Sequence, residues 1–292
     1  MTSNKTNPNE KNAVSWISTD WLAAHLSQSE IRILDVQPNV HDYIQEHIPG
    51  ALYLPEGLMR QHSGRLPSSY INEEAAQAIL RATGVQEELP VVVYTGLGAA
   101  KKWGDGLEQT MLAYSLARFG HPCIFLLDGG LDKWKAEGKL ISQVFPEAQR
   151  SSFQVRRQGN FAVSIDQVKH ALEDPGTILL DARPAAVYQG QGPWPMAGHI
   201  PGAVNLPWRG LMDAANPSLL RSDTEIADLL QQAGVSPSSR LIVSCGTGRE
   251  ATNEFLLFKF HLCYPDVRIY EGSFTEWSAD PNNPTVVGPY PC

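Results

Sequence analysis

Cysteine is scarce in this chain, and long apolar runs are absent. The 292 residues include only 4 cysteines, none in a C-x-x-C pair, which excludes a disulfide framework and gives no indication of a zinc site. No apolar stretch approaches the ~20 residues of a membrane-spanning helix, and the opening MTSNKTNPNEKNAV lacks the apolar core of a signal peptide. These absences predict a cytoplasmic protein that uses no metal and no other cofactor.

Positive charge is also limited. The chain has 23 Lys and Arg against 31 Asp and Glu, a net charge of −8. Without a broad positive field, nucleic acid and anionic membranes are excluded as partners. A small anionic substrate is compatible with this balance, because it needs only a few locally placed arginines. The hydrophobic content of 42% is enough for ordinary cores, and the length suggests two domains at roughly 150 residues each.

The chain contains a long internal repeat. EHIPGALYLP at 46–55 returns as GHIPGAVNLP at 198–207. The other three pairs are ILDVQP (33–38) with LLDARP (179–184), GVQEELPVVVYTGLG (84–98) with GVSPSSRLIVSCGTG (234–248), and LDGGLDKW (127–134) with YEGSFTEW (270–277). The four blocks keep their order and nearly the same offset, so the chain is a tandem duplication of one domain-sized unit.

Within each unit, strand-like and helix-like segments alternate. In the first unit, IRILDV and LPVVVYT are typical of buried strands, and EEAAQAILRATGV is typical of a helix. This alternation predicts an α/β fold of two homologous domains, each a parallel sheet with helices on both faces. We predict an N-terminal tail at 1–13, a first domain at 14–141, a linker at 142–161, a second domain at 162–281 and a C-terminal tail at 282–292.

The stretch SCGTGRE at 244–250 is the strongest candidate for a functional site. Cys245 follows RLIV, a buried strand, and precedes EATNEFLLFKF, whose apolar spacing suits a helix. In parallel sheets, ligands bind at the carboxyl ends of the strands. Backbone N–H groups and the start of a helix favour negative charge there. A turn bracketed by glycines is also a poor place for a core thiol, so we predict that Cys245 is functional.

The motifs of both units resemble those of the rhodanese-type sulfurtransferases with two tandem domains. The first unit carries Tyr43-x-x-x-His47-Ile-Pro-Gly-Ala51, and the second carries Val267-x-x-Tyr-Glu-Gly-Ser-Phe-x-Glu-Trp277. The resemblance covers about residues 14 to 281. It implies two rhodanese-like domains, with an inactive first domain and a catalytic cysteine in the second. Thr95 stands at the position equivalent to Cys245, and a hydroxyl forms no persulfide.

The resemblance implies that Cys245 carries sulfur as a persulfide. Only a thiolate is nucleophilic, and a free thiol with a pKa of ~8.5 is mostly protonated at neutral pH. We expect amide groups of the loop to hold the sulfur ionised. Gly246 and Gly248 let the backbone turn tightly, Thr247 offers a hydroxyl, and the helix that begins near Glu250 adds its positive end.

The identity of the donor is left open by departures from the family pattern. The loop resembles that of mercaptopyruvate sulfurtransferases but ends Arg249-Glu250 in place of Val-Thr, while thiosulfate-preferring relatives have basic residues directly after the cysteine. Arg183 is kept, but Val187 stands where the family has a second arginine that binds the donor. We predict Arg183 and Arg249 as donor-binding residues. The alternatives are an ion pair of Arg183 with Asp181, and a pair of Arg249 with Glu250 or a solvated position.

A Gly- and Lys-rich insertion at 96–109 is a further departure. The first unit lacks the family's Ala-Pro-Arg before FGH. Lys101 or Lys102 would replace the lost positive charge if it reached the cleft between the domains. The simpler interpretation is a solvated lysine pair.

Three functions are consistent with these residues. The leading hypothesis is a sulfurtransferase that takes sulfane sulfur from a small anionic donor, 3-mercaptopyruvate or thiosulfate. The acceptor would be a thiol, such as thioredoxin or glutathione, or cyanide. The alternative is a non-catalytic sulfur-sensing or binding module with the same fold. A cysteine phosphatase is disfavoured, because its Cys-x5-Arg loop needs Arg at 251, where this chain has Ala.

Overall fold

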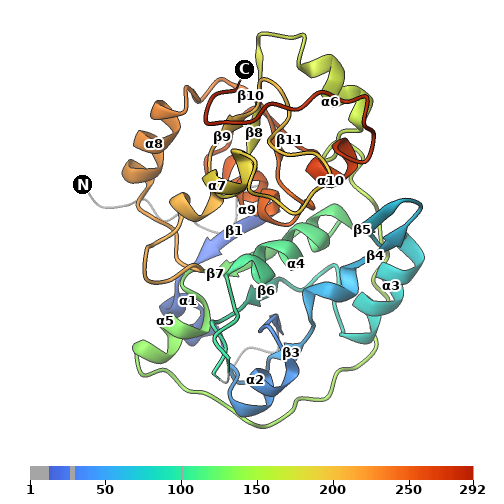
Figure 1. The fold of residues 1–292 in the computed structure, drawn as a ribbon. Coiled ribbons are helices and arrows are strands. Elements are labelled where there is room, and N and C mark those ends of the chain that lie inside the picture. The colour runs from blue at the N-terminus through green and yellow to red at the C-terminus, as the bar shows by residue number, and fades with distance from the viewer. Residues whose placement is uncertain (1–12, 27–29, 100, 292) are drawn as a thin grey trace.

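The computed structural model describes residues 13–26, 30–99 and 101–291. Most of the N-terminal tail predicted at 1–13 therefore lies outside the described residues. Figure 1 shows two α/β domains, the first in the lower half and the second in the upper half of the view.

The sheet of the first domain is parallel throughout, with the strand order β1-β7-β6-β2-β3. Its strands are β1 (Val14–Ile17), β2 (Arg32–Asp35), β3 (Leu52–Tyr53), β6 (Val91–Tyr94) and β7 (Ile124–Leu127). An antiparallel hairpin of β4 (Arg60–Ser63) and β5 (Leu66–Tyr70) stands apart from this sheet. All four residues of β6 are buried, as expected for a central strand that is covered on both faces.

The sheet of the second domain is also parallel, with the strand order β11-β10-β8-β9. Its strands are β8 (Thr177–Asp181), β9 (Val204–Asn205), β10 (Arg240–Ser244) and β11 (Asp266–Ile269). The two sheets correspond strand for strand, except that β1 has no counterpart among the strands of the second sheet.

Helices cover both faces of each sheet. In the first domain, α1 (Thr19–His25) and α5 (Gly130–Ala136) cover one face, and α3 (Glu73–Ala82) and α4 (Leu107–Arg118) cover the other. In the second, α6 (Ile165–Ala171) and α10 (Ser273–Trp277) lie opposite α8 (Asp223–Gln232) and α9 (Glu250–Leu256). The predicted fold class is therefore confirmed.

Short helical segments complete the fold. They are α2 (Val40–Gln45), α7 (Ala185–Tyr188), η1 (Glu56–Met59), η2 (Trp208–Leu211) and η3 (Leu257–His261). In the part of the chain that the structure covers, none of these helices is long and apolar enough to cross a membrane.

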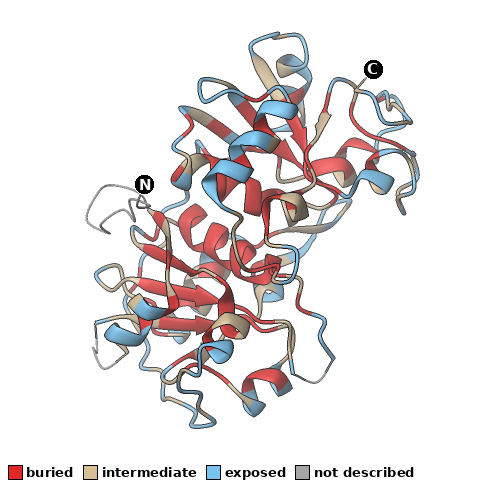
Figure 2. Ribbon diagram, turned by 90° about the vertical axis from the view of Figure 1, so that its left-hand side faces the viewer, coloured by how far each residue is buried: buried red, intermediate tan, exposed pale blue. Residues whose placement is uncertain are grey.

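The two domains share one apolar core. The cluster that fills the face of the first sheet under α3 and α4 continues without a break into the face of the second sheet under α8 and α9. Every residue of α4 is buried, because α4 lies between its own sheet and α9. The Tyr114 and Phe255 rings meet edge to face with 5.2 Å between their centroids. Figure 2 shows this buried zone running from one domain into the other.

A buried ion pair also joins the domains. The carboxylate of Glu271 accepts hydrogen bonds from the Tyr114 hydroxyl and from Arg118 Nε, both at 2.6 Å. Removing one partner of such a pair costs about 3–5 kcal/mol, because the other charge is left buried alone. The contact therefore fixes α4 against the segment that follows β11.

The duplication is visible in matching hydrogen bonds. In the first domain, the Leu131 amide donates to the Thr95 carbonyl at 2.8 Å. In the second, the Phe274 amide donates to the Cys245 carbonyl at 3.0 Å. Each bond joins the residue after a central strand to the helix that follows the neighbouring strand. Thr95 and Cys245 thus occupy equivalent places in the two domains.

The chain between α5 and α6 has little regular structure. It passes around the outer edge of the first domain before it reaches the second (Figure 1). Backbone bonds between His47 and Ser142, at 3.1 and 2.7 Å, and a bond from Arg81 Nε to the Phe153 carbonyl, at 2.7 Å, hold it to that domain.

Candidate active site

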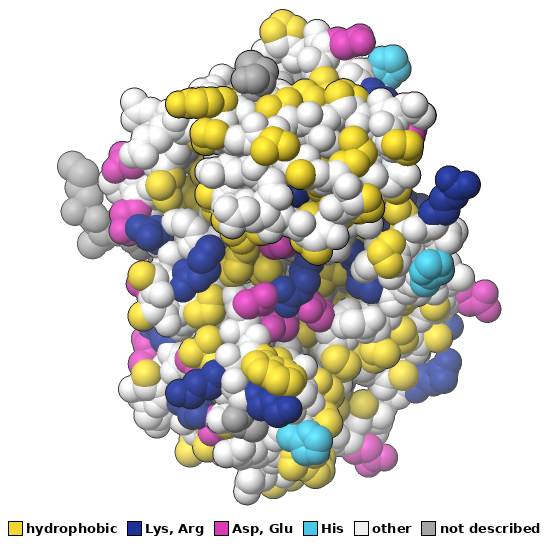
Figure 3. Space-filling view, in the orientation of Figure 1, with side chains coloured by type: hydrophobic (Ala, Val, Ile, Leu, Met, Phe, Trp, Pro, Cys, Tyr) yellow, Lys and Arg dark blue, Asp and Glu magenta, His cyan; other side chains and the backbone are white. Residues whose placement is uncertain are grey.

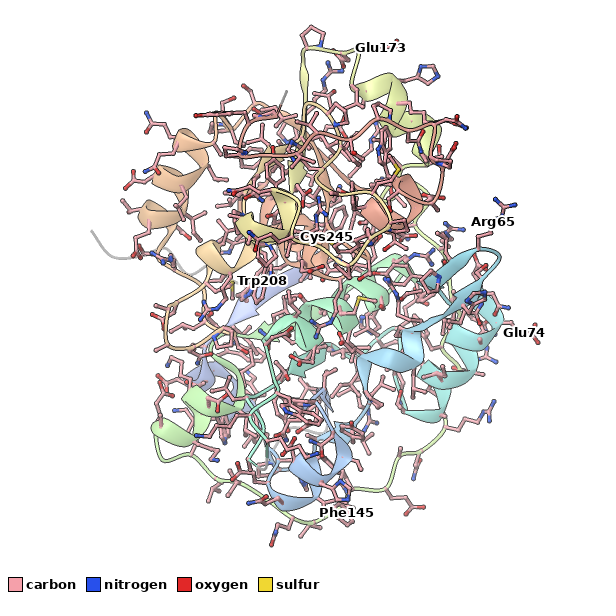
Figure 4. The ribbon with its side chains drawn as sticks, viewed as in Figure 1. Arg65, Glu74, Phe145, Glu173, Trp208 and Cys245 are labelled. Carbon is pink, nitrogen blue, oxygen red and sulfur yellow. The ribbon has the colours of Figure 1, made fainter. Side chains whose placement is uncertain are left out.

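Cys245 is the first residue after β10, at the carboxyl end of the strand, and α9 begins five residues later. Figure 4 shows it at the junction of the two domains. The loop between strand and helix requires both of its glycines. Gly248 has φ +80°, and a Cβ there would lie 2.5 Å from the Glu271 carbonyl oxygen. A Cβ on Gly246 would lie 2.6 Å from the Trp194 ring.

The Cys245 sulfur has polar neighbours from two segments. The Gly248 amide donates to Sγ at 3.0 Å, and the Ser273 hydroxyl oxygen lies 3.8 Å from Sγ. That hydroxyl donates to the Tyr270 carbonyl at 2.8 Å and accepts the Cys245 amide at 3.1 Å. Ser273 therefore places a hydroxyl beside the sulfur, a role that we predicted for Thr247. The Thr247 carbonyl accepts a hydrogen bond from Arg60 of the first domain.

Ser273 was not among the predicted site residues, although the repeat contains a signal for it. Ser273 has φ +50°, in the left-handed region that favours glycine. The equivalent residue of the first domain is Gly130, with φ +57°. A non-glycine residue held in this conformation carries strain, which proteins concentrate at functional sites. The exchange of glycine for serine in the second unit was readable from the sequence.

The protonation state of the thiol differs from the expectation. Cys245 is 0% exposed. Burial raises its pKa far above the ordinary value, and the charge of Glu250 and its hydrogen bond to the thiol raise it further. The Ala251 amide and Ser273 lower the pKa by less. The loop amides that we expected are present, but in this closed arrangement burial outweighs them and the protonated thiol is favoured.

Arg249 is held by carboxylates of the first domain. Its Nε donates to Glu56 Oε1 at 2.7 Å, and its Nη1 and Nη2 donate to the Asp105 carboxylate at 2.6 and 3.0 Å. Glu108 Oε1 lies 3.6 Å from Nη2. All three guanidinium nitrogens therefore have an acidic partner. Arg249 is therefore in ion pairs, but with carboxylates of the first domain in place of Glu250, the partner that one alternative predicted.

This carboxylate cluster carries more negative charge than Arg249 neutralises. Burial and the neighbouring charge of Asp105 raise the pKa of Glu108 to about 7, although Arg249 opposes the shift. Burial also raises the pKa of Glu56. The cluster therefore gains protons in the folded protein at a pH where the unfolded chain has lost them.

Arg183 is fully buried at 1% exposure and forms the ion pair with Asp181 that was the alternative to donor binding. Its Nε lies 2.9 Å from Asp181 Oδ1, and its Nη2 donates to Asp181 and to the Gly198 carbonyl at 2.5 and 3.0 Å. The guanidinium lies 4.2 Å from the centre of the Phe274 ring. Its Nη1 is buried, with no hydrogen-bond partner among the described residues.

The insertion at 96–109 brings acidic side chains to the loop. Lys101 lies over the ring of Trp103, which is 65% exposed, with its Nζ 4.2 Å from the ring centre, and Lys102 is exposed. Asp105 and Glu108, from the end of the insertion, are the residues that reach Arg249. Figure 3 shows basic and acidic side chains gathered at the waist between the domains.

Trp194 covers the loop from the side of the second domain. Its ring packs on Gly246, and its Nε1 donates to Thr275 Oγ1 at 2.8 Å. The Thr275 hydroxyl in turn donates to the Gly246 carbonyl at 2.7 Å. The loop after β10 thus lies between the Trp194 ring and the first domain, which explains why Cys245 is buried.

A cavity of about 290 Å³ lies elsewhere in the second domain. Gln167, His170, Arg240 and Asp266 are among its lining residues, so it opens where β10 and β11 begin. Cys245 lies at the opposite end of β10. This cavity is therefore separate from the candidate site.

Two segments of the chain match the rhodanese-like domain family, residues 18–137 and 164–280. The chain belongs to the rhodanese family of sulfurtransferases. It is similar to a putative thiosulfate sulfurtransferase of Synechococcus elongatus, with 36% identity over 94% of this chain and 86% of that protein. A mitochondrial thiosulfate/3-mercaptopyruvate sulfurtransferase of Arabidopsis thaliana is 32% identical over 92% of this chain and 77% of its own.

Among solved structures, the chain is similar to the 3-mercaptopyruvate sulfurtransferase of Escherichia coli. The TM-score is 0.78 at 28% identity, and the match covers 89% of this chain and 98% of that one. The tandem rhodanese architecture is therefore that of thiosulfate/3-mercaptopyruvate sulfurtransferases. The family match falls in two segments, one in each domain, which agrees with the repeat in the sequence.

Replacing Trp194 with alanine should expose the Cys245 thiol. Without the ring over Gly246, we expect iodoacetamide to alkylate Cys245 faster by about tenfold or more, because opening of the cover limits access to a buried group. Peptide mass mapping measures the rate at Cys245 alone. Trp103→Ala, which removes an exposed ring, is the control. An unchanged rate in Trp194→Ala would contradict the covering role.

Replacing Glu108 with glutamine should change how stability depends on pH. Because the folded-state pKa is raised, the wild type loses stability as pH rises from about 4.5 through about 7, by at most about 3 kcal/mol. Glu108→Gln lacks this loss. Urea unfolding at pH 5 and pH 8 measures the difference, with the exposed Glu74→Gln as control. If the free energy of unfolding changes equally between pH 5 and pH 8 in Glu108→Gln and in the wild type, the pKa of Glu108 is not raised by folding.

Proposed function

We propose that this protein moves sulfane sulfur from thiosulfate or 3-mercaptopyruvate to a thiol or cyanide, with Cys245 as the carrier. The observation that carries the proposal is a cysteine in a strand-to-helix loop of a rhodanese domain, with the Gly248 amide 3.0 Å from its sulfur. The relatives named above act on these two donors according to their descriptions. A cytoplasmic location stays a prediction from the sequence.

Sulfur transfer to the enzyme is a displacement at sulfur. The Cys245 thiolate attacks the outer sulfur of thiosulfate, the new S–S bond forms, and sulfite leaves with the electron pair of the broken S–S bond. With 3-mercaptopyruvate, the C–S bond breaks instead, and the electron pair leaves on the enolate of pyruvate, which takes up a proton. An acceptor thiolate or cyanide then attacks the outer sulfur of the persulfide and releases the Cys245 thiolate.

The thiol must lose its proton before it attacks, although burial favours the protonated form. The Glu250 carboxylate, which acts on the pKa of the thiol, is the group that would accept that proton. The Gly248 and Ala251 amides stabilise the resulting negative charge on the sulfur, and later that of the persulfide. A loop that supplies amides in place of a cation suits a carrier that must also release its sulfur.

The loop residues divide into two roles in this proposal. Gly246, Thr247 and Gly248 shape the backbone around the sulfur. Arg249 fixes the loop to the first domain through its hydrogen bonds to Glu56 and Asp105. Because these carboxylates neutralise its charge, Arg249 does not bind the donor in this proposal. Arg183 keeps one nitrogen without a protein partner and is the donor-binding arginine of the second domain.

A non-catalytic sulfur-sensing or binding module is the second candidate. The observation that favours it is the complete burial of Cys245, together with the missing arginine at Val187. A sensor would take up sulfur and keep it, whereas a transferase returns it to a small acceptor. The two functions therefore differ in the fate of the modified cysteine.

Intact mass after incubation with donor tests the proposal. We expect an adduct of about 32 Da, one sulfur, on the wild type and its removal by cyanide. Cys245→Ser should form no adduct and show no turnover with either donor, while Cys123→Ser and Cys263→Ser should behave as wild type. Turnover that survives in Cys245→Ser would refute the assignment. An adduct that cyanide leaves in place would favour the sensor.

A further inference from the structure

Three arginines surround the catalytic loop, and they differ in how many of their nitrogens are occupied. Arg249, in the loop itself, has carboxylate partners on Nε, Nη1 and Nη2. Arg183 lies against Gly246, with its Cδ 3.8 Å from where a Cβ of that glycine would be. Arg60 reaches the loop from the first domain and donates through Nη2 to the Thr247 carbonyl. All three guanidinium nitrogens of Arg249 therefore have hydrogen-bond partners, whereas Arg60 and Arg183 each have one nitrogen without a partner among the described residues.

Arg60 is the first residue of β4, directly after η1. Its Nε donates to Ser68 Oγ at 2.9 Å, and its guanidinium carbon lies 4.7 Å from the centre of the Tyr70 ring. These contacts fix the guanidinium on the hairpin and present it to the loop of the other domain. Its Nη1 is buried and has no hydrogen-bond partner in the described part of the chain.

Arg60 and Arg183 therefore each keep a buried Nη1 without an acceptor among the described residues, and each lies against the loop that holds Cys245. An unsatisfied buried donor costs about 1–3 kcal/mol, and more if it is charged. An anion removes that cost and adds charge-assisted hydrogen bonds, which are about twice as strong as neutral ones. Glu56 lies near Arg60; its Oε1 accepts from Arg249, and its Oε2 is buried without a hydrogen-bond partner among the described residues.

We propose that Arg60 binds the anionic end of the sulfur donor, its carboxylate or sulfonate group, across the catalytic loop. The inference rests on the proposed function and names a residue for it. In the family, an arginine of the second domain supplies this positive charge, at the position where this chain has Val187. Here Arg60 of the first domain supplies it instead.

The sequence alone does not indicate that Arg60 binds the donor. Arg60 lies 187 residues before Thr247 and outside every repeated block, so no motif marks it. It also differs from the predicted lysines of the 96–109 insertion, which lie on the surface. The compensation for the missing arginine thus comes from the hairpin of the first domain.

Iodoacetate and iodoacetamide provide a matched pair of probes, because they alkylate the same thiol and differ in one carboxylate. We expect the ratio of the iodoacetate to the iodoacetamide rate at Cys245 to fall about 10- to 100-fold in Arg60→Met, and to recover partly in Arg60→Lys. Arg65→Met is the control, because it removes the same charge from the same hairpin. Arg65 is exposed and points away from Cys245 in Figure 4.

Steady-state kinetics with both donors form the second arm. Arg60→Met should raise KM for the true donor about 10- to 100-fold and lower kcat by less. A loss confined to 3-mercaptopyruvate identifies a carboxylate ligand, and a loss confined to thiosulfate identifies a sulfonate ligand. Thermal melting confirms that each variant is folded. If Arg60→Met does not fold, the same measurements are made on Arg60→Lys.

Three results would overturn the proposal. The alkylation ratio could be unchanged in Arg60→Met, or it could fall equally in Arg65→Met, which would indicate only a general field. The two alkylation rates could also fall together, which would make Arg60 a support of the loop through Thr247. A different pair of results would refute the proposed function alone. In that case the wild type transfers no sulfur, but Arg60→Met still lowers the ratio of the iodoacetate to the iodoacetamide rate, so the anion site is retained.

Discussion

The Cys245 thiol is buried where the two domains meet, and the other features of the site are best understood from this burial. The Cys245 sulfur lies where β10 ends, within an apolar cluster that both domains share. Such a position disfavours a thiolate, yet the chemistry of sulfur transfer requires one. The Gly248 amide and the Glu250 carboxylate offer the sulfur a donor and a place for its proton.

The first domain contributes side chains to the candidate site. It has Thr95 in place of the cysteine, but it supplies Glu56 and Asp105 to Arg249 and the guanidinium of Arg60 to Thr247. The catalytic loop is thus ordered by groups that the second domain alone does not contain. The candidate site is therefore formed by both copies of the duplicated fold.

Local pattern was sufficient to predict the elements and the position of Cys245, because repeats, apolar periodicity and a glycine-bracketed turn are properties of short segments. It was not sufficient for contacts between the domains. The partners of Arg249 lie 193 and 144 residues away, and Trp194 comes from a segment with no counterpart in the repeat. The protonation of the thiol was misjudged for the same reason, since burial by the other domain is not visible in the loop sequence.

A crystal structure of the protein soaked with thiosulfate or 3-mercaptopyruvate tests the central claim most directly. The account predicts one additional sulfur bonded to Cys245 Sγ, at about 2.05 Å as in other S–S bonds, with the Gly248 amide directed at the pair. An unmodified Cys245 beside a modified Cys123 or Cys263 would contradict it, because the sulfur would then be carried outside the loop on which the mechanism depends.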